Sequence, residues 1–277
     1  MRLEFSHAGR VAAPRSFMTN PQYIKGAIDA TGCISNAWEM IKPNYWLFFG
    51  ISLLSYVLIA CIPCLNVILM GPVMGGVYYT AFRAMRGEPI EFGMMFKGFE
   101  RFLPLMIVGI VQAIPSIIYQ GFDISIRVSN IGIESILRGR GGEPGGGELA
   151  IAGGYLAVII IVAVVLMIFA IVWGISFAFA IPIIVENENM SPMEALKLSA
   201  RAAWSNVGGI VVLAILCFLV AFVGVLALCI GVLFVLPVIW VAWAFAYRQV
   251  FPDMGGGPAY RYEPPSPQSY GNFGQGI

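Results

Sequence analysis

The chain has 277 residues, of which 59% are hydrophobic and only 11% are charged. Soluble domains carry about 25% charged residues, and this sequence contains four uncharged runs of 18 residues or more, so a soluble globular protein is excluded. The net charge of +1 offers no basic face for nucleic acid. The only histidine, His7, lies in the N-terminal segment, which disfavours histidine-based metal sites and serine–histidine catalysis, and we expect no cofactor.

The four uncharged runs predict the membrane spans. A helix needs about 20 residues to cross the bilayer, so the first run, 45–82, and the last, 206–247, are each long enough for a helical hairpin. The run 149–185 fits one long helix or two short ones. We expect an all-α, polytopic bundle of six transmembrane helices. Their spans are about 45–62, 66–82, 102–122, 149–185, 206–228 and 230–247.

The distribution of Lys and Arg predicts the orientation. Six spans place 13 of the 16 basic residues on one side, whereas a seventh span within 149–185 leaves 9 against 7. Basic residues favour the cytoplasmic side. We therefore prefer six spans, with both termini in the cytoplasm.

An amphipathic segment precedes each expected hairpin, which predicts a threefold internal repeat. In the third segment, Ser191-Pro192-Met193-Glu194 is a helix-starting capping box. We expect the apolar stripe of each segment to face lipid or packed protein on the cytoplasmic side. The stripes comprise Ile34, Trp38, Ile41 and Tyr45; Phe92, Phe96, Phe99 and Leu103; and Met193, Leu196, Ala200 and Trp204.

Three segments lack the composition of a packed domain. Residues 1–22 are expected to form a flexible tail, and residues 252–277, rich in Gly, Pro and Tyr, a disordered one. Six glycines in 139–147 predict a flexible linker between two spans. The transmembrane domain is thus expected to cover residues 23–251.

Few polar groups lie within the expected spans, and none is ionisable. Gln112 is the most polar side chain there, and it either bonds to backbone or contacts a substrate. The motif Gly71-Pro72-Val73-Met74-Gly75-Gly76 predicts close helix packing, with an unwound ligand-binding segment as the alternative. Backbone bonding and close packing are the preferred interpretations.

Two further groups are candidates for a site. Cys61, Cys64 and Cys229 lie at expected outer turns and either form a disulfide or serve as small apolar residues. At the inner side, we expect Arg83 and Arg86 to face the loop that contains Glu186 and Glu188. These charges either hold an anionic headgroup or pair with each other.

Several short motifs can be considered together. They are Gly71-Pro72-Val73-Met74-Gly75-Gly76-Val77-Tyr78, Arg86-Gly87-Glu88-Pro89-Ile90, Phe96-Lys97-Gly98-Phe99, Pro182-Ile183-Ile184-Val185 and Ser191-Pro192-Met193-Glu194-Ala195-Leu196. Together they resemble a family of uncharacterised bacterial integral membrane proteins, and a similar multi-helix region is fused to glycerophosphodiester phosphodiesterases. The resemblance covers about residues 34–251 and implies a bacterial inner-membrane location and six spans, but no catalytic residue.

These observations favour a non-enzymatic scaffold or accessory subunit of a membrane complex, with membrane lipids and either protein partners or further copies of the chain around it. The alternative is a carrier or flippase for a neutral or lipid-like molecule, which a cavity lined by Gln112 would support. An embedded enzyme is the weakest hypothesis, because Glu186 and Glu188 are its only candidate pair.

Overall fold

The computed structural model describes residues 23–60, 63–140, 146–226 and 230–254. This part of the chain contains helices and turns but no strand. In chain order the elements are α1 (Ala30–Ile41), the 3-10 helix η1 (Lys42–Asn44), α2 (Tyr45–Ala60), α3 (Pro63–Met85), the 3-10 helix η2 (Phe92–Arg101), α4 (Phe102–Arg140), α5 (Gly146–Phe177), α6 (Ala180–Glu186), α7 (Pro192–Trp204), α8 (Val207–Leu226) and α9 (Gly231–Val250).

The helices make this a membrane protein. Five helical segments of the described chain are long and apolar enough to cross a bilayer: Ala30–Ala60, Phe92–Ser129, Gly153–Glu186, Val207–Leu226 and Gly231–Val250. The expected span 66–82 lies in α3, which is not one of the five. Six spans therefore stay a prediction.

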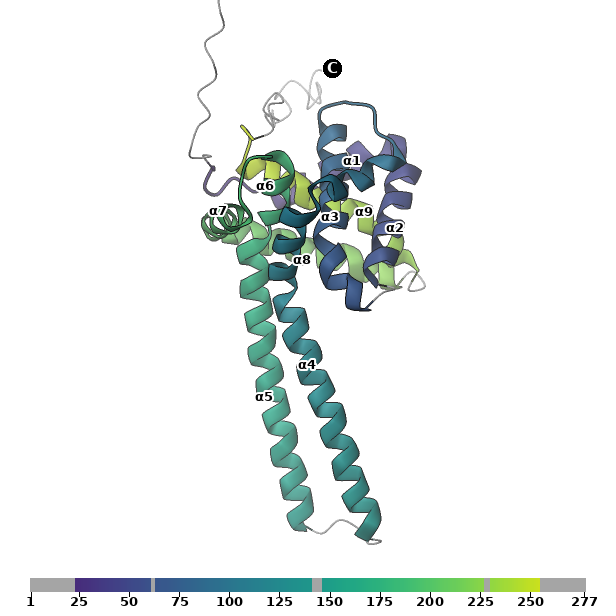
Figure 1. Ribbon diagram of the computed structural model, residues 1–277, viewed down its shortest axis with the longest axis vertical. Coiled ribbons are helices and arrows are strands. Elements are labelled where there is room, and N and C mark those ends of the chain that lie inside the picture. The colour runs from purple at the N-terminus through teal and green to yellow at the C-terminus, as the bar shows by residue number, and fades with distance from the viewer. Residues whose placement is uncertain (1–22, 61–62, 141–145, 227–229, 255–277) are drawn as a thin grey trace, which may run out of the picture.

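The molecule consists of a bundle and a long arm (Figure 1). Helices α4 and α5 pack side by side and extend together far beyond the other helices. The pair α8–α9 runs obliquely across the bundle, whereas α2 and α3 follow the direction of the arm. The consecutive pairs α2–α3, α4–α5 and α8–α9 are each in contact, but their passage through the membrane as three equivalent hairpins is a prediction.

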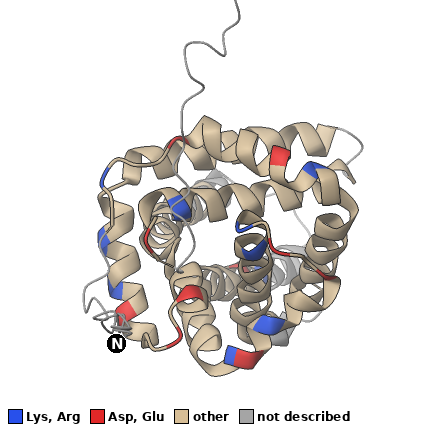
Figure 2. Cartoon of the chain, turned by 90° about the horizontal axis from the view of Figure 1, so that it is seen from above, with Lys and Arg blue, Asp and Glu red and all other residues tan. Residues whose placement is uncertain are grey.

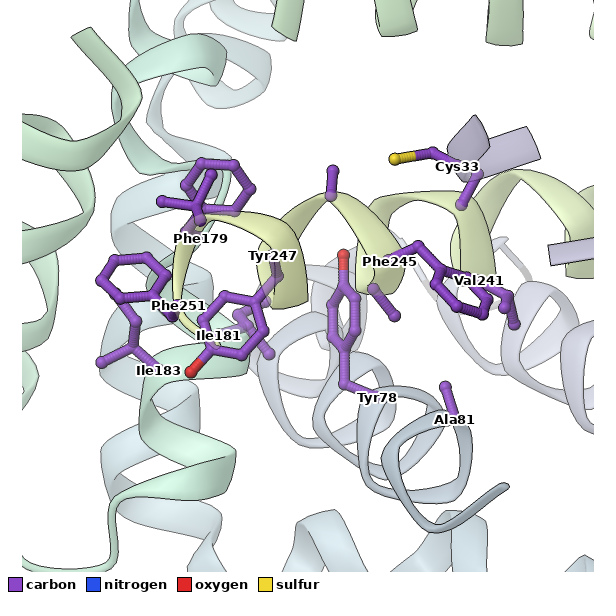
Figure 3. Packing of buried hydrophobic residues seen from close by; sticks show 14 of the residues in the cluster. Cys33, Tyr78, Ala81, Phe179, Ile181, Ile183, Val241, Phe245, Tyr247 and Phe251 are labelled. Atoms are coloured by element: carbon purple, nitrogen blue, oxygen red, sulfur yellow. The ribbon is translucent and has the colours of Figure 1, made fainter. Parts of the chain in front are cut away.

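The core of the bundle lies around the C-terminal half of α9. Ala242, Ala244, Ala246, Tyr247 and Val250 have no exposed surface, and α9 contacts α1, α2, α3 and α8. Figure 3 shows Phe179, Tyr247 and Phe251 gathered at one end of this core, and Val241 and Phe245 further along α9. The small side chains of α9 let its neighbours approach closely, and its large ones fill the space between them.

The capping box before α7 is confirmed. The Ser191 hydroxyl accepts a hydrogen bond from the Glu194 N–H at 3.3 Å, and the Glu194 carboxylate accepts one from the Ser191 N–H at 3.1 Å. These two bonds satisfy backbone donors at the start of the helix. The hydrogen bond to the Ser191 backbone holds the pKa of Glu194 below its ordinary value of 4.5.

The predicted apolar stripes of the three amphipathic segments are divided between the surface and the core. Trp38, Phe92, Phe96, Met193 and Trp204 are 42–60% exposed, whereas Ile41 and Leu196 are buried. The rest of the buried set is mostly small, namely Ala30, Cys33 and Ala37 on α1, Met95 and Gly98 on η2, and Ala195, Ser199, Ala202 and Ala203 on α7. Small side chains allow these short elements to pack tightly.

Two expected boundaries differ from the structure. Helix α4 does not end near residue 122 but continues to Arg140, so much of the expected outer loop and the first part of the glycine linker are helical. The run 149–185 is neither one unbroken helix nor two spans, because a turn at Ala178 and Phe179 separates α5 from the short α6.

The described chain begins with a segment that crosses the ends of α7, α8 and α9. The Ile24 N–H donates to the Val250 carbonyl at 2.9 Å. Asn206, only 3% exposed, accepts from the Ala27 N–H and donates to the Ile24 carbonyl. At the other end of the chain, Met254 is buried, so the packed part extends three residues beyond the expected boundary at 251. Residues 1–22 and 255–277 lie outside the described residues.

Candidate functional site

A cavity of about 710 Å³ lies between the bundle and the upper end of α5. Ligand sites in proteins commonly occupy about 300–1,000 Å³. Helices α3, α4, α5, α6, α8 and α9 all contribute to its wall, and none of the lining residues is charged. Its polar groups are limited to the Gln112 amide, the Tyr78 hydroxyl and the indoles of Trp173, Trp240 and Trp243.

The cavity opens sideways, between α5 and α8. Among the described residues these two helices make no extended contact with each other. Three lining residues on them, Ile171, Ile215 and Phe218, are 54–67% exposed and rim the opening. The exposed surfaces of both helices around the opening are apolar.

Gln112 ties α4 to the end of α5 at the edge of this cavity. Its Nε2 donates to the Phe177 carbonyl at 2.6 Å, and one position earlier the Val111 carbonyl accepts from Trp173 Nε1 at 2.8 Å. The Phe177 carbonyl is free of helical bonding because α5 ends there. Gln112 thus bonds to backbone, as preferred from the sequence, and also lines the cavity, whereas its contact with a substrate stays a prediction.

Ser199 of α7 bridges the break between α5 and α6. Its hydroxyl accepts from the Phe179 N–H at 3.1 Å and donates to the Ser176 carbonyl at 3.0 Å. Trp204, one turn beyond Ser199, donates to the Ser176 hydroxyl at 3.2 Å. Sequence analysis missed Ser199, because nothing in α7 indicates that this serine bonds to the turn between α5 and α6, twenty residues earlier in the chain.

Aromatic side chains separate the cavity from the charged end of the bundle, which is the end where the charged residues of 83–101, 186–201 and 248–253 lie. Tyr78 lines the cavity, and Phe82, one turn further along α3, stacks on it with ring centroids 6.1 Å apart. The ring centroids of Phe82 and Tyr247 are 5.3 Å apart, and Phe179 and Phe251 complete the layer. Figure 3 shows Tyr247, Phe179 and Phe251 together. All four rings beyond Tyr78 are at most 2% exposed. The cavity is therefore closed on this side.

A buried ion pair lies beyond that aromatic layer. Arg248 of α9 binds the Glu186 carboxylate, and the two side chains are only 9% and 3% exposed. The Arg248 guanidinium also lies over the Phe82 ring, 4.7 Å from its centroid, and donates to the Met254 carbonyl. The Glu186–Arg248 pair joins α6 to α9. Sequence analysis did not single out Arg248, which directly follows the last uncharged run, 206–247.

The expected group of inner-side charges comes together in part, because Arg86 interacts electrostatically with Glu186 although its ion pair is with Glu88. Arg83 and Arg86 both bind Glu88, at 2.6 and 2.5 Å, and these contacts, foremost the hydrogen bond from Arg86, lower the pKa of Glu88 below its ordinary value. Glu188 is exposed and does not share a site with the buried Glu186. Charged residues lie on several helix ends and loops around the bundle when it is viewed from above (Figure 2).

Arg101, which sequence reasoning did not single out, fixes the end of α6. It donates to the carbonyls of Ile184, Asn187 and Glu188. The Ile184 carbonyl is one that a helix leaves unpaired at its C-terminus, and those of Asn187 and Glu188 follow directly after α6. In the sequence, Arg101 is a single arginine just before an expected span, and such a residue is equally typical of any basic side chain at the membrane surface.

The Gly71–Gly76 motif lies in an unbroken stretch of α3. A Cβ added to Gly71 would lie 1.9 Å from the Leu105 carbonyl oxygen, and one added to Gly76 would lie 1.6 Å from that of Met95. Gly75 instead contacts the Leu105 side chain. The glycines thus let α3 contact the backbones of η2 and α4. Pro72 lies inside α3 without interrupting it, so the motif packs closely and is not unwound.

The cysteine candidates cannot be placed together. Cys61 and Cys229 lie outside the described residues, and the side chain of Cys64 does too. Within the described part of the chain, no three His, Cys, Asp or Glu side chains are arranged to hold a metal ion. No family model, curated protein or solved structure matches this chain, so the resemblance to the phosphodiesterase-fused membrane region stays a prediction.

Proposed function

We propose that this protein is a carrier in the bacterial inner membrane that takes a neutral, lipid-like molecule from the bilayer into the cavity between α5 and α8. The observation that carries the proposal is a cavity of about 710 Å³ whose lining holds no charge and whose opening has an apolar rim. A binding site of this kind accepts an apolar chain without leaving a charged group unpaired.

The position of the helix break supports a carrier. Interrupted helices beside a cavity supply free backbone groups for a ligand and points at which a helix can bend. Here the break lies at Ala178, a residue that lines the cavity, and it is held by Gln112 and Ser199. The aromatic layer closes the cavity toward the charged end, so a carrier must rearrange this layer to release its ligand there.

The charge distribution supports the expected orientation. Outside the α4–α5 arm, the charged residues of the described chain fall within 25–42, 83–101, 186–201 and 248–253, beside helix ends. By the positive-inside rule we expect this end, with both termini, to lie in the cytoplasm.

The experiment uses the full-length protein in lipid nanodiscs with a photoactivatable diacylglycerol carrying its reactive group in one chain. We expect labelling to concentrate on residues 170–178 and 210–218. Ala214→Phe, which fills the cavity from α8, should reduce that labelling at least fivefold. Val212→Phe is the matched control, because Val212 is 49% exposed on the same helix but does not line the cavity.

Uniform labelling along the exposed faces of α5 and α8, with no difference between the two variants, would contradict the proposal. Equal effects of both variants would also contradict the proposal, because they would indicate a general distortion of α8 and not the filling of the cavity.

A scaffold or accessory role is the second candidate. It is favoured by exposed aromatic residues on three separate short elements, Trp38 on α1, Phe96 on η2 and Trp204 on α7. Crosslinking in native membranes from single cysteines at these positions tests it. Reproducible attachment to one protein neighbour supports the role, whereas attachment to lipid alone contradicts it.

A further inference from the structure

The Tyr78 hydroxyl lies in the wall of the cavity without a hydrogen-bond partner. Tyr78 lines the cavity together with Met70 and Met74, which precede it by two turns and one turn on the same face of α3. Within the described part of the chain, no group accepts a hydrogen bond from its hydroxyl. The Ser55 hydroxyl is also unpartnered but fully enclosed by protein, whereas the Tyr78 oxygen keeps accessible surface. Because Tyr78 is only 7% exposed and lines the cavity, that surface belongs to the cavity.

The polar groups of the wall fall into two sets. On α4 and α5, the Gln112 amide and the Trp173 indole each donate to a backbone carbonyl of the other's helix. On α3 and α9, the Tyr78 hydroxyl and the indole N–H groups of Trp240 and Trp243 bond to none of the described residues. An indole N–H can only donate, and a phenol hydroxyl carries a donor as well. The unpartnered groups of this side of the wall therefore offer hydrogen-bond donors, and Figure 3 shows Tyr78 extending from α3 with its hydroxyl toward α9.

The surroundings make an acceptor on the ligand valuable. The layer that includes Phe82 and Tyr247 closes the cavity toward the charged end, and the rim of the opening is apolar. A ligand made only of hydrocarbon would displace any water from the Tyr78 hydroxyl and leave it unpaired, which costs free energy. A ligand that presents an acceptor oxygen to the hydroxyl avoids this cost.

The absence of charge from the wall restricts that acceptor to a neutral group. None of the lining residues is charged, and the Arg248 guanidinium lies beyond the aromatic layer, where it binds Glu186. A carboxylate or phosphate in the cavity would be a buried anion without a cation, which is far more costly than a neutral polar group. A carbonyl oxygen is uncharged and accepts hydrogen bonds well.

We propose that the Tyr78 hydroxyl donates to a carbonyl oxygen at the polar end of the ligand, so that the cavity selects uncharged lipids with an ester or ketone carbonyl. This inference rests on the proposed function, because it assigns the substrate class of the same cavity. Stacking on Phe82 holds the Tyr78 ring in place, and the apolar chain of the ligand leaves between α5 and α8. Diacylglycerols and isoprenoid quinones both carry such a carbonyl.

The test adds competition by unlabelled lipids to the labelling with photoactivatable diacylglycerol in nanodiscs. Dioleoylglycerol and its dioleyl ether analogue share their chains and their free hydroxyl, but only the first has carbonyl groups. In the unmodified protein, dioleoylglycerol should halve the labelling of residues 170–178 and 210–218 at a concentration about tenfold lower than the ether requires. An isoprenoid quinone is the third competitor. If it matches dioleoylglycerol, ketones belong to the class, and if it competes no better than the ether, the class is restricted to esters.

Tyr78→Phe removes the hydroxyl and keeps the ring that stacks on Phe82. The preference for dioleoylglycerol over the ether should fall from about tenfold to about twofold or less. Because both competitors are measured against the same probe, this ratio does not depend on how tightly a variant binds the probe. Tyr56→Phe is the matched control and should keep the full preference, since Tyr56 is 46% exposed on α2 and does not line the cavity.

The outcomes separate this inference from the proposed function. If labelling concentrates at the cavity but both glycerolipids compete equally, or if the preference survives Tyr78→Phe, the assignment of a carbonyl to Tyr78 is wrong and the cavity remains a binding site. If labelling does not concentrate at the cavity in the unmodified protein, the proposed function and this inference are both overturned.

Discussion

The bundle and the α4–α5 arm use similar residues in opposite ways. In the bundle, glycines contact neighbouring backbones, Ser199 bonds to the turn between α5 and α6, and the Glu186–Arg248 ion pair is almost completely buried. In the arm, Gly121 and Gly153 face open space, Ser129 bonds only within its own helix, and the ion pair is exposed. The same residue type therefore has a large effect on stability in one region and little in the other, and matched substitutions can measure the difference.

The largest difference is expected for the two ion pairs. Arg248→Met leaves the Glu186 carboxylate buried without its cation, which should destabilise the protein by about 3–5 kcal/mol. Arg127→Met removes an exposed pair in the arm and should leave the unfolding transition unchanged. Thermal unfolding in detergent micelles, at a dilution where the chain is monomeric, measures both. The double variant Glu186→Met/Arg248→Met should regain part of the loss, and its failure to do so would argue against the pair as the cause.

The glycines provide the second comparison. Gly76→Val forces a side chain into the Met95 backbone and should cost about 3 kcal/mol, at the upper end for overpacking. Gly121→Val, in the arm, meets nothing within 4 Å and should be neutral or slightly stabilising. The same unfolding measurement applies. If the two substitutions cost the same, close contact between α3 and η2 does not hold the bundle together.

The serines give a smaller contrast. Ser199→Ala leaves the Phe179 N–H and the Ser176 carbonyl without their bridge, which should cost about 1–3 kcal/mol. Ser129→Ala removes a hydroxyl that bonds to the Ser125 carbonyl on an exposed helix face and should change little. Hydrogen exchange at residues 176–182 should rise in Ser199→Ala alone. Unchanged exchange there would mean that Ser199 does not hold the break between α5 and α6.

The sequence predicts the helices of the bundle well because charge and turn residues mark their ends. The uncharged runs correspond to α2–α3, the first half of α4, α5–α6 and α8–α9. For the break after Phe177 the sequence holds one signal, Pro182, which cannot donate to the Ala178 carbonyl in a continuous helix, but it does not reveal the residues of α4 and α7 that satisfy the break. A cavity built by six helices is likewise invisible in any one segment.

The stripes divided between surface and core show a second limit. Periodicity identifies an apolar face, but in a membrane protein both lipid and core accept apolar side chains. On α7 the sequence leaves open whether the stripe with Met193 and Trp204 faces lipid or packed protein; in the structure these two are exposed, and Ala202 and Ala203 are buried. Size decides between the faces here, because small side chains permit the close approach that packing in membranes requires.

The smallest predicted effect concerns a feature that sequence alone locates, the capping box of α7. Glu194 has a pKa below its ordinary value of 4.5 in the folded protein, so its contribution to stability is fully present above about pH 4.5 and is lost as the pH falls through the lowered value. Glu194→Gln keeps a hydrogen-bonding partner for the Ser191 N–H but cannot titrate. Unfolding followed from pH 6 to pH 3 should therefore show a weaker acid dependence in the variant. An identical pH profile would mean that the charged form of Glu194 contributes nothing to this helix start, and that the box acts through the Ser191 hydroxyl alone.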